Sequence, residues 1–148
     1  MNEKLAPNKQ VPAVEGWFTW PPSAEPHLIG SRCKSCSDYF FPKVTACRNP
    51  KCMSTALEEV LLSRKGKLWT YTINYAPAPP PYVPPDPFVP YAICAVELEK
   101  EKMRIQGQVS VECDFSKLKI GMDMELVLEP LYKDSQGNDV MVWKFRPV

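Results

Sequence analysis

Four of the six cysteines lie in two closely spaced pairs. Cys33 and Cys36 are separated by two residues, Cys47 and Cys52 by four, and ten residues connect the pairs. Two thiol pairs of this spacing can bind one metal ion tetrahedrally, because each tight loop presents two sulfurs and the connecting segment lets the loops close on each other. We expect one zinc ion per chain, bound by these four cysteines.

Two other states of these cysteines are compatible with the spacing. Two disulfides, or four free thiols, are disfavoured because nothing in the sequence indicates secretion, and such spacing in an intracellular chain favours metal. Iron is the second alternative, since rubredoxins also use four thiolates, but the Cys47–Cys52 pair is wider than their usual doubled CxxC. Zinc is therefore the favoured ion. A zinc ion held by four thiolates has no open coordination position, which makes it structural.

The remaining residues offer no complete catalytic set. Cys94 alternates with apolar residues in a predicted strand and is expected to fill the core, while Cys113 follows a strand and is assigned no role. His27 is the only histidine, and we expect it at the surface near the metal loops. The sequence also lacks paired carboxylates, a glycine-rich phosphate loop and a Ser/His/Asp set. We therefore expect that the chain is not an enzyme on its own.

Length and charge narrow the class of protein further. A chain of 148 residues fits one domain, or a small appendage plus one compact domain. The 18 basic and 17 acidic residues give a net charge of +1, so no broad basic surface indicates nucleic acid or an anionic membrane. No apolar run reaches the roughly 20 residues of a membrane span, and the first residues lack a signal peptide's apolar stretch. We expect a cytoplasmic protein, where thiolate ligands persist.

Residues 1–27 are predicted to form an N-terminal segment with one short helix. Val14, Trp17 and Phe18 fall at helical spacing, whereas Gly16 weakens the helix and two following prolines end it. A helix this short is marginal in water. Its aromatic side chains must therefore dock on the chain's own core or on a partner.

Residues 28–55 are expected to form the metal-binding ribbon, and a periodicity of two dominates from there on. Within 67–75, Trp69 and Tyr71 share one face with Ile73 and Tyr75. The predicted strands cover residues 57–62, 67–75, 91–98, 103–111, 122–128 and 140–146. We expect five or six antiparallel strands that close into a barrel over residues 56–148, because closure removes sheet edges. The predicted fold is mostly β, with a short N-terminal helical segment, a four-cysteine ribbon and a barrel.

A proline-rich arm (residues 76–90) interrupts the barrel pattern, with eight prolines in fifteen residues. Such a run can be neither helical nor part of a sheet ladder, so we expect an extended, stiff segment. Aromatic residues in and beside the arm are our candidates for ligand or partner binding: Tyr75, Tyr82, Phe88 and Tyr91. A preformed arm loses little entropy on docking. The alternative is a stiff surface loop packed on its own barrel.

Several stretches together resemble a known family. They are PHLIGSRCKSCSDYFFPK, the second cysteine pair, LWTYTINYAPAP, VPYAICAVEL, IGMDMELVLEPL and the terminal WKFRPV, and the resemblance covers residues 14–148 in order. The chain resembles acyl-CoA-associated proteins that join a rubredoxin-like zinc ribbon to an OB-fold barrel. Ser37 and the charged turn at residues 99–102 depart from this family, which more often places glycine at both positions.

The resemblance implies a function. Members of the resembled family look like non-catalytic small subunits. They pair with thiolases, thiolase-like acyltransferases or thiolase-like aldolases and help to hold the CoA ester. The WFTWPP opening is most similar to the thiolase-partner branch, which implies carbon–carbon bond chemistry and includes anaerobic aromatic degradation. We therefore expect a thiolase-like catalytic partner in a hetero-oligomer, a dimer of heterodimers, together with acyl-CoA. Thiolase chemistry needs an activated cysteine and a histidine base, which the partner would supply.

Nucleic-acid binding is the main alternative function, because zinc ribbons and OB barrels both occur in such proteins. That function needs a basic groove with stacking aromatic residues. The aromatic residues are present, but basic and acidic residues balance, and acidic residues recur along the barrel strands. We therefore expect no nucleic-acid or membrane partner. Lys65, Lys67 and Arg104 are candidates for contacts with the phosphates of a CoA ester.

Overall fold

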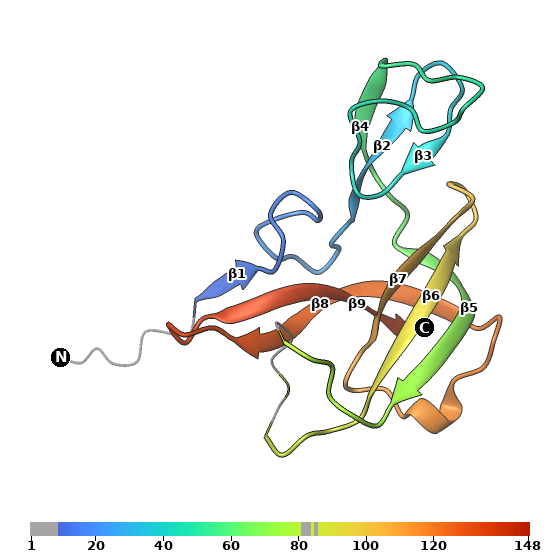
Figure 1. Cartoon of the computed structure of the whole chain (residues 1–148). Coiled ribbons are helices and arrows are strands. Elements are labelled where there is room, and N and C mark those ends of the chain that lie inside the picture. Colours follow the sequence, from blue (N-terminus) through green and yellow to red (C-terminus); the bar gives the residue numbers. More distant parts are fainter. Residues whose placement is uncertain (1–8, 81–83, 85) are drawn as a thin grey trace.

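The computed structural model describes residues 9–80, 84 and 86–148, so Tyr82 lies outside the described residues. Figure 1 shows a small three-stranded sheet standing at one end of a larger barrel. The strands of the small sheet are β2 (Ile29–Cys33), β3 (Tyr39–Phe40) and β4 (Leu57–Leu61). The other elements are β1 (Gln10–Pro12), β5 (Lys65–Asn74), β6 (Tyr91–Leu98), β7 (Met103–Val109), a 3-10 turn η1 (Phe115–Lys117), β8 (Asp123–Lys133) and β9 (Asp139–Pro147).

The small sheet has the order β3-β2-β4, with both pairs antiparallel. The predicted strand over residues 57–62 forms as β4, but it pairs with β2 in this sheet and not with the barrel. Gly30 permits the close approach of β3, because a Cβ atom there would lie 2.6 Å from the Phe40 carbonyl oxygen. Ser37 has a φ of 70°, in the left-handed region that favours glycine. This backbone conformation agrees with the expectation that the resembled family more often places glycine at this position.

The barrel consists of β5 to β9, and its closure confirms the predicted five-stranded architecture. The sheet order is β1-β9-β7-β6-β5-β8, and an additional β8–β9 pairing closes it. The prediction of a wholly antiparallel barrel is wrong at one pair, because β7 and β9 pair in parallel. The parallel pair follows from closure, because strand directions cannot alternate all the way round a closed barrel of five strands. The sixth strand is β1, which adds in parallel to β9.

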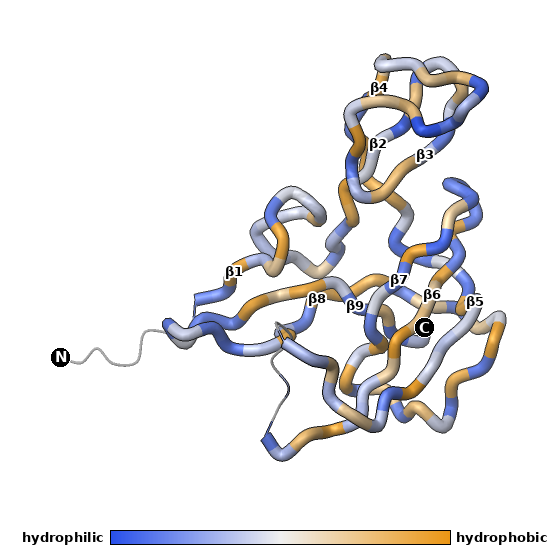
Figure 2. Tube along the Cα trace, in the orientation of Figure 1, coloured by the Kyte–Doolittle hydropathy of each residue, from blue (hydrophilic) through white to orange (hydrophobic). Residues whose placement is uncertain are grey.

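The barrel core forms from the inward positions of these strands. Figure 2 shows hydrophobic and hydrophilic positions interspersed along the barrel strands. The largest fully buried side chains include Leu68, Val96, Leu98, Met124, Leu126 and Phe145. Cys94 is also buried, as expected of a core residue. A register shift between Leu68 and Thr70 changes the predicted alternation of β5: Leu68 faces the core, whereas Trp69 is 46% exposed.

The predicted short helix around Val14, Trp17 and Phe18 is wrong, because residues 13–20 form bends, turns and an isolated bridge. Gly16 has a φ of 83°, which no right-handed helix accommodates. Backbone pairing replaces the helix: the Ile29 N–H donates to the Trp17 carbonyl at 2.8 Å, and Phe18 forms a bridge with Leu28. Phe18 is buried in the core. Of the two predicted alternatives, docking on the chain's own core or on a partner, the structure shows the first for Phe18.

Candidate functional site

The turns of the ribbon bring the four predicted cysteines together. Cys33 ends β2, and its N–H donates to the Asp38 carbonyl at 2.8 Å, which folds the first loop back. In the second loop the Cys47 N–H donates to the Ser54 carbonyl at 2.7 Å. As a result, the Sγ atoms of all four cysteines lie within 4.8 Å of one another.

The sulfur distances fit a shared metal ion better than disulfides. The Sγ atoms of Cys33 and Cys52 are 3.7 Å apart, and those of Cys36 and Cys47 are 3.6 Å apart. A disulfide needs about 2.05 Å, whereas four sulfurs around a tetrahedral zinc at about 2.3 Å are separated by roughly 3.8 Å. The four thiols therefore form a candidate metal centre. Thiolate donors in this geometry suit zinc or iron.

The ribbon backbone also favours the thiolate form of one ligand. A backbone hydrogen bond from Cys36 lowers the pKa of the Cys33 thiol to about 6, although burial opposes this shift. Burial raises the pKa of the Cys47 thiol. Metal binding requires the deprotonated thiolates. The loop geometry thus prepares one ligand electrostatically, and the remaining thiols need the metal's charge to lose their protons.

The two other cysteines have no such environment. Burial raises the pKa of the Cys94 thiol to about 12, as expected for an inert core thiol. Burial also raises the pKa of the Cys113 thiol, which lies outside the four-cysteine cluster. His27 is half-buried, and its Nδ1 lies 2.9 Å from the Leu62 carbonyl oxygen. Through this hydrogen bond, the only histidine of the sequence contacts the connection between ribbon and barrel.

The structure brings some of the predicted arm residues together. The Phe88 and Tyr91 rings pack edge to face, with centroids 6.2 Å apart. Tyr75 is 74% exposed and follows the Asn74–Tyr91 pair that closes the base of the arm. The arm forms one wall of a groove of about 580 Å³, and β8 forms the other. The groove-lining residues include Pro84, Val89 and Pro90 of the arm, Tyr91 at the start of β6, and Pro130, Leu131, Tyr132 and Lys133 of β8.

Sequence reasoning missed a polar group that lines this groove. Lys144 of β9 is 2% exposed, and its Nζ lies 3.5 Å from Oε1 of Glu129. Glu129 also accepts hydrogen bonds from the Ser110 hydroxyl and, at 3.2 Å, from the Val111 N–H. A buried ammonium among apolar walls is rare unless it is paired. The available signal was the position of Lys144 between two large aromatic residues in an alternating strand.

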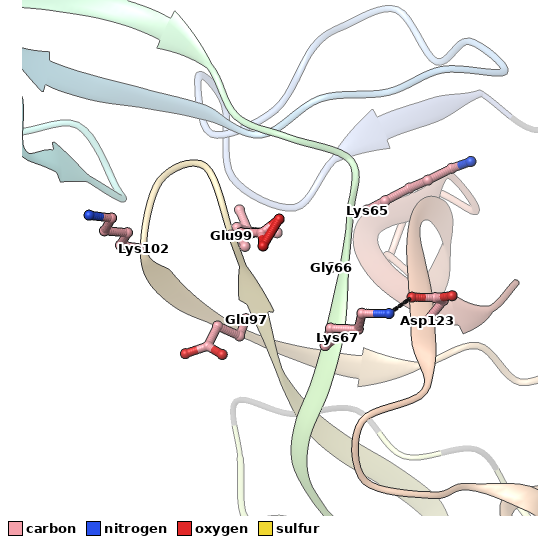
Figure 3. Close-up of a pocket in the computed structure, with 8 residues that line it drawn as sticks. Lys65, Gly66, Lys67, Glu97, Glu99, Lys102 and Asp123 are labelled. Carbon is pink, nitrogen blue, oxygen red and sulfur yellow. Dashed lines mark hydrogen bonds and ion pairs between the residues drawn. The ribbon is translucent and has the colours of Figure 1, made fainter.

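The predicted basic residues do not converge on one point. Figure 3 shows a depression of about 530 Å³ in which Lys67 reaches Asp123 while Lys65 extends away from it. Arg104 pairs with Glu97 at 3.4 Å. Two of the three candidates for phosphate contacts are therefore already paired with carboxylates.

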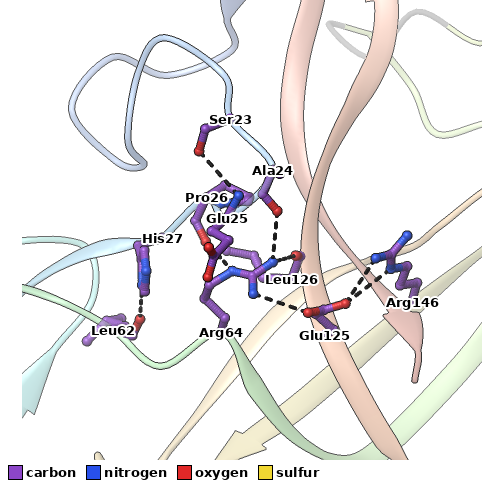
Figure 4. A network of polar contacts seen from close by, with 10 residues as sticks. All are labelled: Ser23, Ala24, Glu25, Pro26, His27, Leu62, Arg64, Glu125, Leu126 and Arg146. Carbon is purple, nitrogen blue, oxygen red and sulfur yellow. Dashed lines mark hydrogen bonds and ion pairs between the residues drawn. The ribbon is translucent and has the colours of Figure 1, made fainter.

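A second group missed from the sequence joins the ribbon to the barrel. Arg64 lies in the connection between β4 and β5 and donates to the carbonyl oxygens of Ala24, Pro26 and Leu126. Its guanidinium also pairs with Glu125 at 3.1 Å, and Figure 4 shows Arg146 on the other side of this carboxylate. Arg146 and Arg64 hold the pKa of Glu125 below its usual value. Arg64 thus ties the N-terminal segment, the connection and β8 together.

Two further contacts fix the same connection. The carboxylate of Glu101 accepts hydrogen bonds from the Ser63 N–H at 2.7 Å and the Ser63 hydroxyl at 2.9 Å. Trp17 packs against Phe41 of the ribbon and Trp143 of the barrel, with centroids 5.5 Å and 5.9 Å away. These contacts hold the ribbon in one position relative to the barrel.

The described residues contain no helix long and apolar enough to cross a membrane.

Fold and site together define a protein in which a four-cysteine ribbon is joined to an OB-type barrel. Family models agree: "ChsH2, rubredoxin-like zinc ribbon domain" matches residues 20–58, and "ChsH2, C-terminal OB-fold domain" matches residues 59–129. A DUF35 domain-containing scaffold protein of Methanocaldococcus jannaschii is 39% identical over 125 residues, which cover 82% of each chain. This chain therefore belongs to the ChsH2-type DUF35 family, and the family resemblance seen in the sequence is confirmed.

Other relatives are named as parts of enzymes. Benzoylsuccinyl-CoA thiolase subunit BbsA of Thauera aromatica is 30% identical over 128 residues, covering 83% of this chain and 78% of that subunit. Among solved structures, a chain of the Ltp2-ChsH2(DUF35) aldolase matches with a TM-score of 0.59 and 26% identity. That match covers 82% of this chain and 84% of the other. The relatives thus include scaffold proteins and thiolase subunits.

The metal centre generates the first prediction. Cys47→Ser removes one ligand, so the variant is expected to lose its metal and the folded ribbon, because structural zinc in finger peptides contributes about 10–16 kcal/mol. Elemental analysis and far-UV circular dichroism measure both effects. Cys113→Ser is the matched control and should keep one metal ion per chain. A metal-free, fully folded wild-type protein would contradict the assignment.

The Arg64 network generates the second prediction. Arg64→Met leaves Glu125 and three carbonyl groups without their donor, so the free energy of unfolding should fall by about 2–4 kcal/mol. Urea denaturation followed by tryptophan fluorescence measures this loss. The control is Lys43→Met, because the pair between Lys43 and Glu59 is exposed and should contribute less than about 1 kcal/mol. Equal losses in the two variants would show that the network is not what holds the connection.

Proposed function

We propose that this chain is a non-catalytic subunit that binds a thiolase or thiolase-like catalytic partner in a hetero-oligomer. The observation that carries this proposal is its similarity, over four-fifths of its length, to proteins named as thiolase subunits. The chemistry of the described residues supports it. Four cysteines converge on a metal centre, Cys94 is buried, and His27 contacts a backbone carbonyl. The described residues therefore contain no cysteine–histidine pair able to perform thiolase chemistry.

The metal in this proposal is one structural zinc ion, bound by Cys33, Cys36, Cys47 and Cys52. The donor set of four thiolates and the sulfur distances support it. Bound zinc would supply charge and cross-linking to a ribbon too small for a core of its own. The four thiolates also support a reducing compartment such as the cytoplasm.

The proline-rich arm and its flanking aromatic residues form the proposed contact with the partner. Tyr75 and Val89 are 74% and 59% exposed, and exposed apolar side chains that lie together often mark an interaction surface. Tyr82, Phe88 and Tyr91 complete the proposed surface. The prolines limit the entropy that the arm loses on docking. Trp, Tyr and Arg side chains at such sites commonly provide most of the binding energy.

The finer proposal concerns substrate and assembly. We place the acyl-CoA thioester between the catalytic subunit and the arm groove, whose apolar walls can cover the substrate's uncharged portion. The assembly is a dimer of heterodimers, and the reaction forms or cleaves a carbon–carbon bond. The similarity to BbsA supports a role in anaerobic aromatic degradation, as the small subunit of a benzoylsuccinyl-CoA thiolase.

The arm generates the third prediction. The double substitution Tyr75→Ala and Phe88→Ala removes two aromatic contacts, so the affinity for the catalytic subunit should fall at least about tenfold. Surface plasmon resonance with the co-expressed thiolase-like subunit measures the affinity. The control is Ile120→Ala, an exposed apolar residue beyond the arm. Normal association of the double variant would make the arm a passive surface loop.

The fourth prediction concerns His27. His27→Ala removes one hydrogen bond to the Leu62 carbonyl, but it removes no catalytic group if the partner supplies the chemistry. Turnover of acyl-CoA by the assembled complex should therefore stay nearly unchanged. A large loss of turnover in a variant that still assembles would show that His27 takes part in the reaction.

A further inference from the structure

Trp69 is exposed on the outer face of the barrel, and a β-bulge places it there. The bulge lies between Leu68 and Thr70 on β5, so that Trp69 and Thr70 both point away from the core. Bulges often redirect a side chain toward a functional surface. The Arg104 guanidinium stacks on the Trp69 ring, with its carbon 3.8 Å from the ring centroid. Since Arg104 lies on β7, the indole reaches across β6, where Ala95 leaves room.

A row of four charged residues crosses the same face. Register pairs align Asp123 of β8 with Lys67 of β5, Lys67 with Glu97 of β6, and Glu97 with Arg104 of β7. The row therefore alternates in sign across four adjacent strands: negative, positive, negative, positive. All four side chains are about half exposed or more, at 63%, 63%, 47% and 50% in that order. Figure 3 shows Lys67 reaching Asp123, with Glu97 on the neighbouring strand.

An even-numbered alternating row is complementary to itself after a two-fold rotation. Consider a two-fold axis that lies above this face, parallel to the strands and between β5 and β6. Rotation about it places the same face of a second copy opposite the first, with the order of the four charged residues reversed. Asp123 then meets Arg104 of the second copy, and Lys67 meets Glu97, each pair twice. The same contact would include the Trp69 ring of each copy, because that ring lies beside Arg104 on this face. Isologous contacts of this kind are the commonest in soluble oligomers.

We propose that the outer face of β8, β5, β6 and β7 is a contact between two copies of this chain. The row has no net charge, so it offers no field for a nucleic acid or another polyanion, whereas its sign pattern matches its own reverse. Trp69 and Arg104 supply the residue types that dominate interface energetics. The row lies at the start of β5 and the arm follows its end, so this contact leaves the proposed partner surface free.

Sedimentation velocity of the full-length chain over a concentration series tests the proposal. The wild-type chain should show a reversible dimer. Arg104→Asp places two aspartates opposite each other in the dimer, and Asp123→Arg places two arginines opposite each other. Each variant should dimerise at least about tenfold more weakly, and Trp69→Ala should also weaken the dimer. Lys119→Asp, a charge reversal outside the row, should dimerise like the wild type.

An equimolar mixture of the Arg104→Asp and Asp123→Arg chains is the decisive sample. In the mixed dimer, the new aspartate faces the new arginine and the native Asp123 faces the native Arg104, so association should return toward the wild-type level. A wild-type chain that stays monomeric would overturn the proposal, as would variants that dimerise normally or a mixture that does not recover. Thermal melting of each variant verifies folding. The contact uses no arm residue, so its failure would leave the proposed catalytic partner untouched.

Discussion

The structure depends on the fact that its ribbon is too small to be stable by itself. Three short strands and two loops bury few apolar side chains, and sheets of this size need additional support. The convergence of four thiols can provide part of that support, since a metal ion bound by all four would join both loops. The barrel provides the rest through Trp143, which contacts Trp17, and through the Leu126 carbonyl, which accepts a hydrogen bond from Arg64 of the connection. The connection between ribbon and barrel is therefore a packed, hydrogen-bonded region, and the two parts present their surfaces in a fixed relation.

Much of the fold follows from patterns that are local in sequence. Alternating hydrophobicity predicts the barrel strands, and cysteine spacing predicts the metal cluster, because both depend on residues close together in the chain. Ser37 and Lys102 show a subtler local effect: both adopt positive φ, at 70° and 55°, the backbone region that favours glycine. The departures noted in the sequence thus mark left-handed turns.

The errors arose where distant contacts override local preference. Residues 12–20 have helical spacing, yet pairing with residues 27–29 and the positive φ of Gly16 hold them in turns. The bulge at Trp69 depends on the β6 register. Arg64 and Lys144 acquire their roles only from carbonyl and carboxylate groups that folding brings to them. A lysine or an arginine in a sequence does not reveal which acceptors will surround it.

These features support the proposed role of a subunit that offers binding surfaces and leaves the chemistry to a catalytic partner. The most direct test is to co-express the chain with a thiolase-like protein encoded beside it and to determine the mass of the purified species by native mass spectrometry, together with acyl-CoA turnover. The account predicts a hetero-oligomer with one zinc per copy of this chain, and turnover by the complex but not by this chain alone. Separate species, or acyl-CoA turnover by the isolated chain, would contradict it.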